Sequence, residues 1–199
     1  MLLCAAALMC GTIAFAQSNT STVLQTGSGN ASDVAQTGLM NNSDVNQLGN
    51  GNDAEVDQVG TTNDSDKDQL GNDNQYKTSQ TGTDNTTTTL QDGDRNQGGG
   101  TFLIYGTLQN GTNNDAVTTS TGDDNNAGTR QFGTDNTSDI NQLGNRNVAN
   151  GVQWGVRQAG DRNDADVDQL GDDNLMDNLR QDGADNYFKI TQNGNNNEA

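Results

Sequence analysis

Apolar and polar side chains alternate in short segments that recur along most of the chain. In one of these segments Ser43, Val45 and Gln47 alternate with polar residues. The position of Val45 is β-branched or aliphatic in every recurrence except the one with Lys67, and the position of Ser43 is most often Ser or Ala. A side-chain period of two predicts a β-strand with one buried face. We therefore expect each segment to form a strand of roughly seven residues that ends at the Gln or just after it.

The strands are in phase with a repeated unit, Gln-x-Gly-x-x-Asn, which recurs mostly every 11 residues and gives 15 half-repeats. Ser120 replaces the Gln in one of them. The Gln anchors are Gln25, Gln36, Gln47, Gln58, Gln69, Gln80, Gln91, Gln109, Gln131, Gln142, Gln158, Gln169, Gln181 and Gln192. The glycines follow two positions later, at Gly27, Gly38, Gly49, Gly60, Gly71, Gly82, Gly93, Gly111, Gly122, Gly133, Gly144, Gly160, Gly171, Gly183 and Gly194. The asparagines follow five positions after the anchor, at Asn30, Asn41, Asn52, Asn63, Asn74, Asn85, Asn96, Asn114, Asn125, Asn136, Asn147, Asn163, Asn174, Asn186 and Asn197.

Each half-repeat is interpreted as one strand and one tight turn. Gly reaches positive φ without penalty, and Asn tolerates left-handed geometry and bonds its own backbone, so Gly-x-x-Asn is the expected turn. Two half-repeats make a rung of about 22 residues with two facing strands, and the rungs stack in parallel. The predicted fold is all-β, a parallel β-solenoid of strand-turn-strand rungs that becomes cross-β on polymerisation. Stacked Gln and Asn side chains are expected to form structural ladders that satisfy polar groups in a thin apolar core.

Residues 1–16 are expected to be a signal peptide, which leaves 17–199 as one repeat domain. The apolar run ends in Ala14-Phe15-Ala16, a small-x-small cleavage pattern, although no Lys or Arg precedes it. The run is too short to span a bilayer as a helix. We therefore expect an exported protein that is found outside the cell.

The composition argues against several classes of function. The chain has no His and no Pro, and both of its Cys residues lie in the expected signal peptide. Because it also lacks a nucleophile elbow, we predict no catalytic residue, no cofactor and no metal site, and we do not expect an enzyme. The net charge of −18 argues against nucleic acid and anionic membranes as partners, and no specific small molecule is indicated.

The repeat is interrupted near residues 97–103 and 148–157, and one extra residue falls between Gln169 and Gln181. The first interruption leads into the apolar segment 101–105, TFLIY, which is either a lateral or nucleating contact or, as we prefer, an arc that folds back onto the solenoid. Four aromatic residues stand where Ser or Ala is usual, and they either widen the core or mark faces that turn outward. These residues are Tyr76, Tyr105, Trp154 and Phe188.

Acidic residues concentrate at outward positions. Asp33, Asp44, Glu55 and Asp66 each stand three positions before an anchor, and we expect them to stack in pairs one rung apart. Like charges at that spacing repel, so these residues form either a solvated face or a brake on polymerisation that cations or lower pH would relieve. Acidic turns such as GDDN at 122–125 offer oxygen ligands for weak Ca²⁺ binding, although they do not match the nonapeptide that loads Ca²⁺ into β-rolls.

The spacing of Gln, Gly and Asn, with Ser or Ala and a β-branched residue before the Gln, resembles the curlin repeat from about Ser21 to Asn197. Clear instances are SDVNQLGNGN at 43–52 and SDINQLGNRN at 138–147. The resemblance implies a structural subunit of an extracellular, curli-like amyloid fibre that polymerises with itself at the bacterial surface for biofilm matrix and adhesion. It also implies two further partners, an outer-membrane secretion pore and a nucleator or major-subunit homologue. The chain departs from the family pattern in having more repeats and no Gly-rich segment before them.

A second interpretation is a discrete, non-polymerising extracellular β-solenoid, either an adhesin or a Ca²⁺-binding module. A monomer that stays soluble and gains structure only with Ca²⁺ would favour it. Within the fibre interpretation, major subunit and nucleator both stay open. The arginines of the C-terminal part suit a nucleator, whereas the overall acidity suits a bulk subunit.

Overall fold

The computed structural model describes residues 18–98, 106–149 and 155–199. The remaining segments lie outside the described residues, and with them lie the expected signal peptide, the apolar segment 101–105, Tyr105 and Trp154. Within the described ranges no helix is long and apolar enough to cross a membrane.

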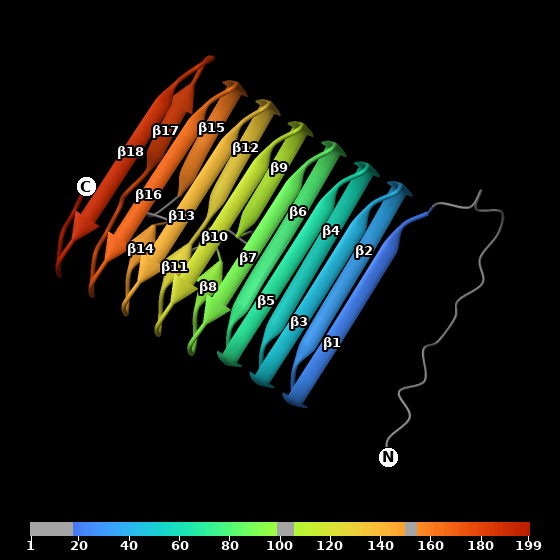
Figure 1. Ribbon diagram of the computed structural model, residues 1–199, viewed down its shortest axis with the longest axis horizontal. Helices are drawn as coiled ribbons and strands as arrows, with labels where there is room; N and C mark the ends of the chain where they lie inside the picture. Colours follow the sequence, from blue (N-terminus) through green and yellow to red (C-terminus); the bar gives the residue numbers. More distant parts are fainter. Residues whose placement is uncertain (1–17, 99–105, 150–154) are drawn as a thin grey trace.

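The strands form two parallel sheets that face each other along the whole molecule (Figure 1). The first sheet contains, in spatial order, β1 (Thr20–Ser28), β3 (Asn42–Asn50), β5 (Asp64–Asn72), β7 (Thr86–Asp92), β10 (Asp115–Thr121), β13 (Thr137–Leu143), β16 (Asp164–Leu170) and β18 (Tyr187–Asn193). The second contains β2 (Ala31–Leu39), β4 (Asp53–Thr61), β6 (Gln75–Thr83), β8 (Gln97–Gly98) with β9 (Thr107–Thr112), β11 (Asn126–Ala127) with β12 (Thr129–Thr134), β14 (Val148–Ala149) with β15 (Val156–Asp161), and β17 (Leu179–Asp182).

Consecutive half-repeats alternate between the two sheets, so each rung takes one half-repeat from each. Gln25 pairs with Gln47 and Gln36 with Gln58, a step of 22 residues in both sheets. Eight strands stacked in the first sheet give about seven turns. The predicted all-β, parallel β-solenoid with about 22 residues per rung is confirmed.

The strands of the first six half-repeats are longer than predicted. Each contains nine residues and runs past the Gln through the Gly, as Thr20–Ser28 does. The prediction of roughly seven residues was too short because the turn glycines also pair in parallel, for example Gly27 with Gly49. Glycine therefore bends the chain at the corner of the rung while it stays in the ladder.

The core is thin and largely polar. Val45, Val56, Ile140 and Val167 are fully buried, as the alternation predicted for their position. Small apolar clusters form around Val45 and Val56 at one end and around Ile140 and Val167 at the other. Most of the remaining interior consists of buried Gln, Asn, Ser and Thr side chains, so the fold depends on hydrogen bonds between polar groups more than an ordinary globular core does.

All three interruptions lie on the second sheet, one above another. Residues 99–105 fall between β8 and β9, and residues 150–154 fall between β14 and β15. Gln97, Asn126, Val148 and Leu175 stack before the interruption in successive rungs. The structure places Gln97–Gly98, Val148–Ala149 and Val156–Asp161 in strands that flank the segments 99–105 and 150–154.

Tyr76 lies inside the core, so of the two outcomes expected for the aromatic residues it does not turn outward. Its side chain is buried, and its ring lies so close to Gly98 and Gly106 that a Cβ on either glycine would be 2.3 or 2.4 Å from it. The Tyr76 hydroxyl lies 2.9 Å from the Thr107 hydroxyl. Phe188 lies on the last strand of the first sheet instead, where 39% of it is exposed.

Candidate functional site: side-chain ladders and the two open ends

Two columns of Gln carboxamides run through the core, one along each sheet. Gln25 Nε2 donates to Gln47 Oε1 at 2.7 Å, and Gln47 Nε2 donates to Gln69 Oε1 at 2.8 Å. The column of the second sheet, from Gln36 to Gln181, has six such bonds between 2.8 and 3.0 Å. Gln47 Nε2 also donates to the Ala31 carbonyl of the facing sheet at 2.8 Å. A carboxamide such as that of Gln47 therefore links its rung to the next rung and to the opposite strand.

Two columns of Asn side chains occupy the corners of the rungs. Asn63 Nδ2 donates to Asn41 Oδ1 at 3.0 Å, and Asn85 Nδ2 donates to Asn63 Oδ1 at 2.9 Å. In the other corner the backbone N–H of Asn52 donates to Asn30 Oδ1 at 3.0 Å. One column contains Asn19, Asn41, Asn63, Asn85, Asn114, Asn136, Asn163 and Asn186, and the other contains Asn30, Asn52, Asn74, Asn96, Asn125, Asn147, Asn174 and Asn197.

Asn19 was not among the predicted ladder residues, but its Oδ1 accepts the Asn41 backbone N–H at 2.9 Å. It was missed because no Gln-x-Gly precedes it, and its 22-residue distance from Asn41 was the available signal.

The Gln and Asn columns have opposite polarity. Along a Gln column the earlier rung donates to the later one, as Gln25 does to Gln47. Along an Asn column the later rung donates to the earlier one, as Asn63 does to Asn41. The solenoid therefore presents Gln acceptors at its β1 end and Gln donors at its β18 end, so a second copy can extend the columns only head to tail.

The turn glycines combine a positive φ with a close approach between rungs. Gly49 has φ of 125°, and a Cβ there would lie 1.8 Å from the Gly71 carbonyl oxygen of the next rung. Every predicted turn glycine has a positive φ, and those from Gly27 to Gly171 meet the next rung in the same way. At the last rung the space beside Gly183 and Gly194 is open, because the nearest atoms are Asn side-chain nitrogens 3.8 Å away.

The left-handed residue of each turn is the one before the Asn. Asp73 has φ of 55° and Arg95 has φ of 56°, and they precede Asn74 and Asn96. The expectation of left-handed geometry at the Asn was wrong, because the Asn backbone and side chain are both held in the ladder. The expected bond from Asn to its own turn is present, for example from Asn74 Nδ2 to the Leu70 carbonyl at 3.3 Å.

Two residues change the pattern of the interior. Ser120 takes a Gln position, and its hydroxyl donates to Gln142 Oε1 at 3.0 Å. Lys67 takes the β-branched position and is fully buried, with Nζ donating to the carbonyls of Glu55 at 2.8 Å and Tyr76 at 2.9 Å. Its Nζ also lies 5.4 Å from the centre of the Tyr76 ring. Burial lowers the pKa of Lys67 to about 7, because the interior disfavours the charged form.

The two ends of the stack differ from its middle. All nine residues of β1 are exposed, and Val23 is 45% exposed although its partner Val45 is fully buried. At the other end of the first sheet β18 is mostly exposed. Figure 1 shows β1 and β18 at opposite ends of the described stack, with no described strand beyond either. Each end therefore offers a strand edge and one inward row of side chains to a further strand.

The outward face of the first sheet carries a block of carboxylates. Asp44 stacks on Asp66, and on the second sheet Asp33 stacks on Glu55. Partial burial, followed by the charges of Asp68, Asp44 and Asp64, raises the pKa of Asp66. Glu55 is different because the Lys77 ammonium forms an ion pair with it. The repulsion is therefore concentrated on β3 and β5.

The carboxylates of the acidic turns already have protein partners. Arg95 binds Asp124 through two hydrogen bonds of 2.7 and 2.8 Å, and Arg146 binds Asp173 in the same way at 2.6 and 2.8 Å. These bonds lower the pKa of Asp124 and Asp173. In the part of the chain that the structure describes, no group of three or more His, Cys, Asp or Glu residues could hold a metal ion.

A family model matches part of this chain. No curated protein matches it. The family model described as the curlin associated repeat matches residues 133–171, a segment that contains β13, β14, β15 and β16 with their ladder residues Gln142, Gln158 and Gln169. Residues 133–171 are therefore similar to the curlin associated repeat, and the described strands of this segment belong to the parallel β-solenoid.

Proposed function

We propose that this protein is a structural subunit of an extracellular, curli-like amyloid fibre. The observation that carries the proposal is the pair of open strand edges, β1 and β18, at the ends of a solenoid with Gln and Asn columns that run along the stack. The curlin-associated repeat supports the same role. The role is architectural, and the proposal assigns no catalytic residue.

Fibre growth is expected because the strands at the two ends, β1 and β18, each have a paired strand on one side only. A second copy placed head to tail would cover β1 and bury Val23. It would also give the side-chain oxygen Oε1 of Gln25 a hydrogen-bond donor. Strand addition of this kind supplies backbone hydrogen bonds in one step, and stacked polar ladders are a recognised source of cross-β stability. Because the apolar core is thin, each copy gains a large part of its stability from its neighbours.

The cellular setting forms part of the proposal. Residues 1–16 would direct export and be removed, which leaves 17–199 as the repeat domain. Passage through an outer-membrane pore, nucleation by a homologous subunit, and a role in biofilm matrix and adhesion are the corresponding proposals for partners and location. The Gln, Asn and Gly positions of the repeat would act as the structural ladder of the fibre.

A pair of substitutions on β1 tests the stacking. Val23 points into the core row and Leu24 points outward, and both are exposed in the single copy. Val23→Asp would place a buried charge in the joint between copies, whereas Leu24→Asp would leave that charge in solvent. We expect V23D to abolish elongation from seeds and L24D to elongate at close to the wild-type rate, measured by thioflavin fluorescence and electron microscopy.

Comparison of V23D with L24D separates the effect on strand stacking from the effect of the added charge. If V23D elongates as fast as L24D, then β1 is not the growing edge and the proposed assembly is wrong. Circular dichroism of both variants before seeding checks that a difference in elongation does not come from loss of the monomer fold.

A further inference from the structure

Three arginines stack in successive rungs on the outward face of the second sheet. Arg130 of β12 pairs in register with Arg157 of β15, and Arg157 pairs with Arg180 of β17. Neighbouring strands are about 4.8 Å apart, so the guanidinium groups form a regular positive column. Such a column stands out in a chain with a net charge of −18.

One carboxylate serves two members of the column. Asp182 Oδ1 lies 2.8 Å from Arg157 Nη1, and the same carboxylate lies 2.5 Å from Arg180 Nη2. Along β12, β15 and β17, Asp182 is the acidic residue directly beside the column, while Phe132 lies beneath the Arg157 guanidinium at 5.8 Å. The surface therefore keeps an excess of positive charge next to an apolar ring.

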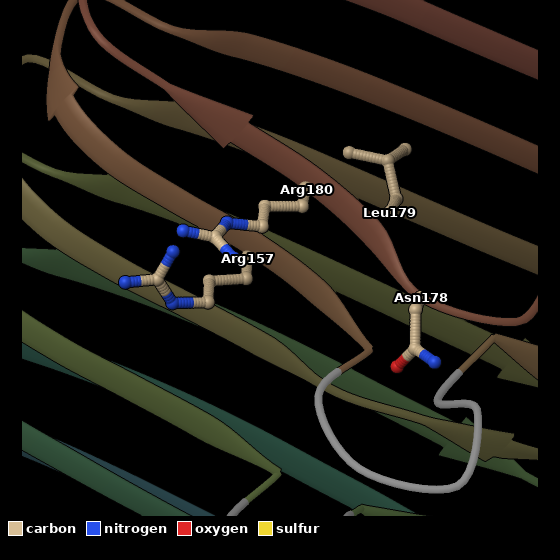
Figure 2. Close-up of a pocket in the computed structure, with 4 residues that line it drawn as sticks. All are labelled: Arg157, Asn178, Leu179 and Arg180. Carbon is tan, nitrogen blue, oxygen red and sulfur yellow. The ribbon is translucent and has the colours of Figure 1, made fainter.

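The column borders a hollow in the surface. Arg157, Asn178, Leu179 and Arg180 line this pocket of about 260 Å³. Figure 2 shows the two arginine side chains side by side, with Asn178 and Leu179 on the same chain segment as Arg180. This face therefore combines positive charge with a pocket that can take side chains of a partner.

The opposite face has the complementary pattern. Asp44 of β3 stacks on Asp66 of β5, and Asp64 and Asp68 flank Asp66 on the same outward face. The one basic residue of β3 and β5, Lys67, points into the core and is fully buried. The raised pKa of Asp66 reflects this uncompensated negative charge as well as partial burial.

The two patches cannot meet within one copy, because they lie on the outer surfaces of opposite sheets. Both have the period of the strand stack, so arginines of the column can lie opposite Asp44 and Asp66 in two successive rungs. We propose that the arginine column of Arg130, Arg157 and Arg180 docks laterally on the aspartate block of Asp44, Asp66 and Asp68 in a second copy of this chain. The inference rests on the proposed fibre and adds which faces of neighbouring filaments meet.

The test compares two triple variants that remove the same charge. R130Q/R157Q/R180Q removes the column, in which Arg157 and Arg180 share Asp182, and R95Q/R146Q/R162Q removes three turn arginines that each have an Asp partner of their own. Three exposed ion pairs correspond to about a tenfold change in an association constant. We expect about a tenfold fall in filament bundling for the column variant and little change for the turn variant, counted by electron microscopy at low salt.

A charge swap tests the partner. R130D/R157D/R180D should form single filaments, and so should D44R/D66R/D68R, whereas a mixture of the two should bundle again. Bundling of the column variant at the wild-type level, or failure of the mixture to bundle, would overturn the proposal. Bundling that requires an added polyanion such as dextran sulfate would also overturn it, because the column would then bind a polymer in place of a second copy.

The same variants separate this inference from the proposed function. Single filaments with a strand-spacing reflection but no arginine-dependent bundling would contradict only the lateral contact. If no variant polymerises, the fibre proposal fails, and sedimentation of the mixed soluble chains still decides the face pairing, because the swap predicts a complex that neither variant forms alone.

Discussion

At the scale of single residues, the turn glycines show how the repeat and the stacking depend on each other. A positive φ alone would favour Gly at position 49, but the approach of the Gly71 carbonyl excludes even a methyl group there. The sequence predicted the first requirement from the turn. The second follows only from the stack, in which every corner lies directly against the next.

Gly49→Ala should therefore be far more damaging than Gly194→Ala. Both residues have positive φ, which costs an alanine about 1–3 kcal/mol, but only at Gly49 does the Cβ collide with backbone. We expect G49A to lower the free energy of unfolding of the monomer by more than G194A does, measured by urea denaturation below the concentration at which fibres form. Equal losses would show that backbone strain alone requires these glycines.

Lys67 makes the stability depend on pH. Its folded-state pKa of about 7 lies below the 10.5 of an exposed lysine, so folding disfavours the proton. This residue should therefore make the free energy of unfolding rise as pH increases from about 7 to 10.5, with no further effect below 7.

Lys67→Met keeps much of the volume and removes the charge. We expect K67M to stabilise the monomer by roughly 1–3 kcal/mol at pH 6 and to remove the rise between pH 7 and 10, measured by urea denaturation at a series of pH values. Lys77→Met is the matched control, since it removes a lysine from the surface of a neighbouring strand. If the free energy of unfolding of the wild-type protein does not change over this pH range, the pKa of Lys67 is not lowered by burial.

At the scale of strands and rungs, the ladders make each half-repeat equivalent to the others. Ser120 is the exception, and the column of the first sheet loses a Gln-to-Gln bond on either side of it. The rung that contains Ser120 should therefore be the weakest point of that column, because a short hydroxyl replaces a carboxamide that would bond in both directions.

Ser120→Gln should complete the column. A buried hydrogen bond contributes about 1 kcal/mol, so we expect S120Q to raise the free energy of unfolding by about that amount. The reverse change at an intact position, Gln47→Ser, should lower it by at least as much, because it removes two Gln-to-Gln bonds. Loss of stability in S120Q would mean that the core at this rung has closed around the smaller side chain.

Much of the solenoid could be predicted because strand, turn and ladder each have a residue type at a fixed spacing. Val45, Gln47 and Gly49 are enough to indicate the inward face, the register and the corner of their half-repeat. The left-handed position could not be predicted, because the burial of Asn74 in its ladder overrides its preference for that geometry. The alignment of the interruptions on one sheet was predictable, since they all precede the anchors Gln109, Gln158 and Gln181 of the second sheet.

At the scale of the whole molecule, the charges divide unevenly between the faces. Asp44 and Asp66 stack without a cation beside them, whereas Lys77 is bound to Glu55 in the other predicted pair. If outward carboxylates slow polymerisation, the first pair should account for most of the effect. Because the pKa of Asp66 is raised, mild acid should protonate its carboxylate and so favour the stacked strands.

Removing these charges should shorten the lag before fibres appear. We expect D44N/D66N to shorten the lag of unseeded assembly at neutral pH more than D33N/E55Q does, followed by thioflavin fluorescence. Lowering the pH towards 5 should shorten the lag of the wild type and have less effect on D44N/D66N. An unchanged lag in both variants would leave the carboxylates as a solvated face without influence on assembly.

The central claim is that copies of this chain polymerise by continuing the strand stack. The most direct measurement is fibre diffraction from residues 17–199, purified under denaturing conditions, diluted into neutral buffer and aligned after incubation. The account predicts unbranched fibres with a meridional reflection near 4.7–4.8 Å. A chain that stays monomeric with or without seeds, and with or without Ca²⁺, would contradict it and would favour a discrete extracellular solenoid.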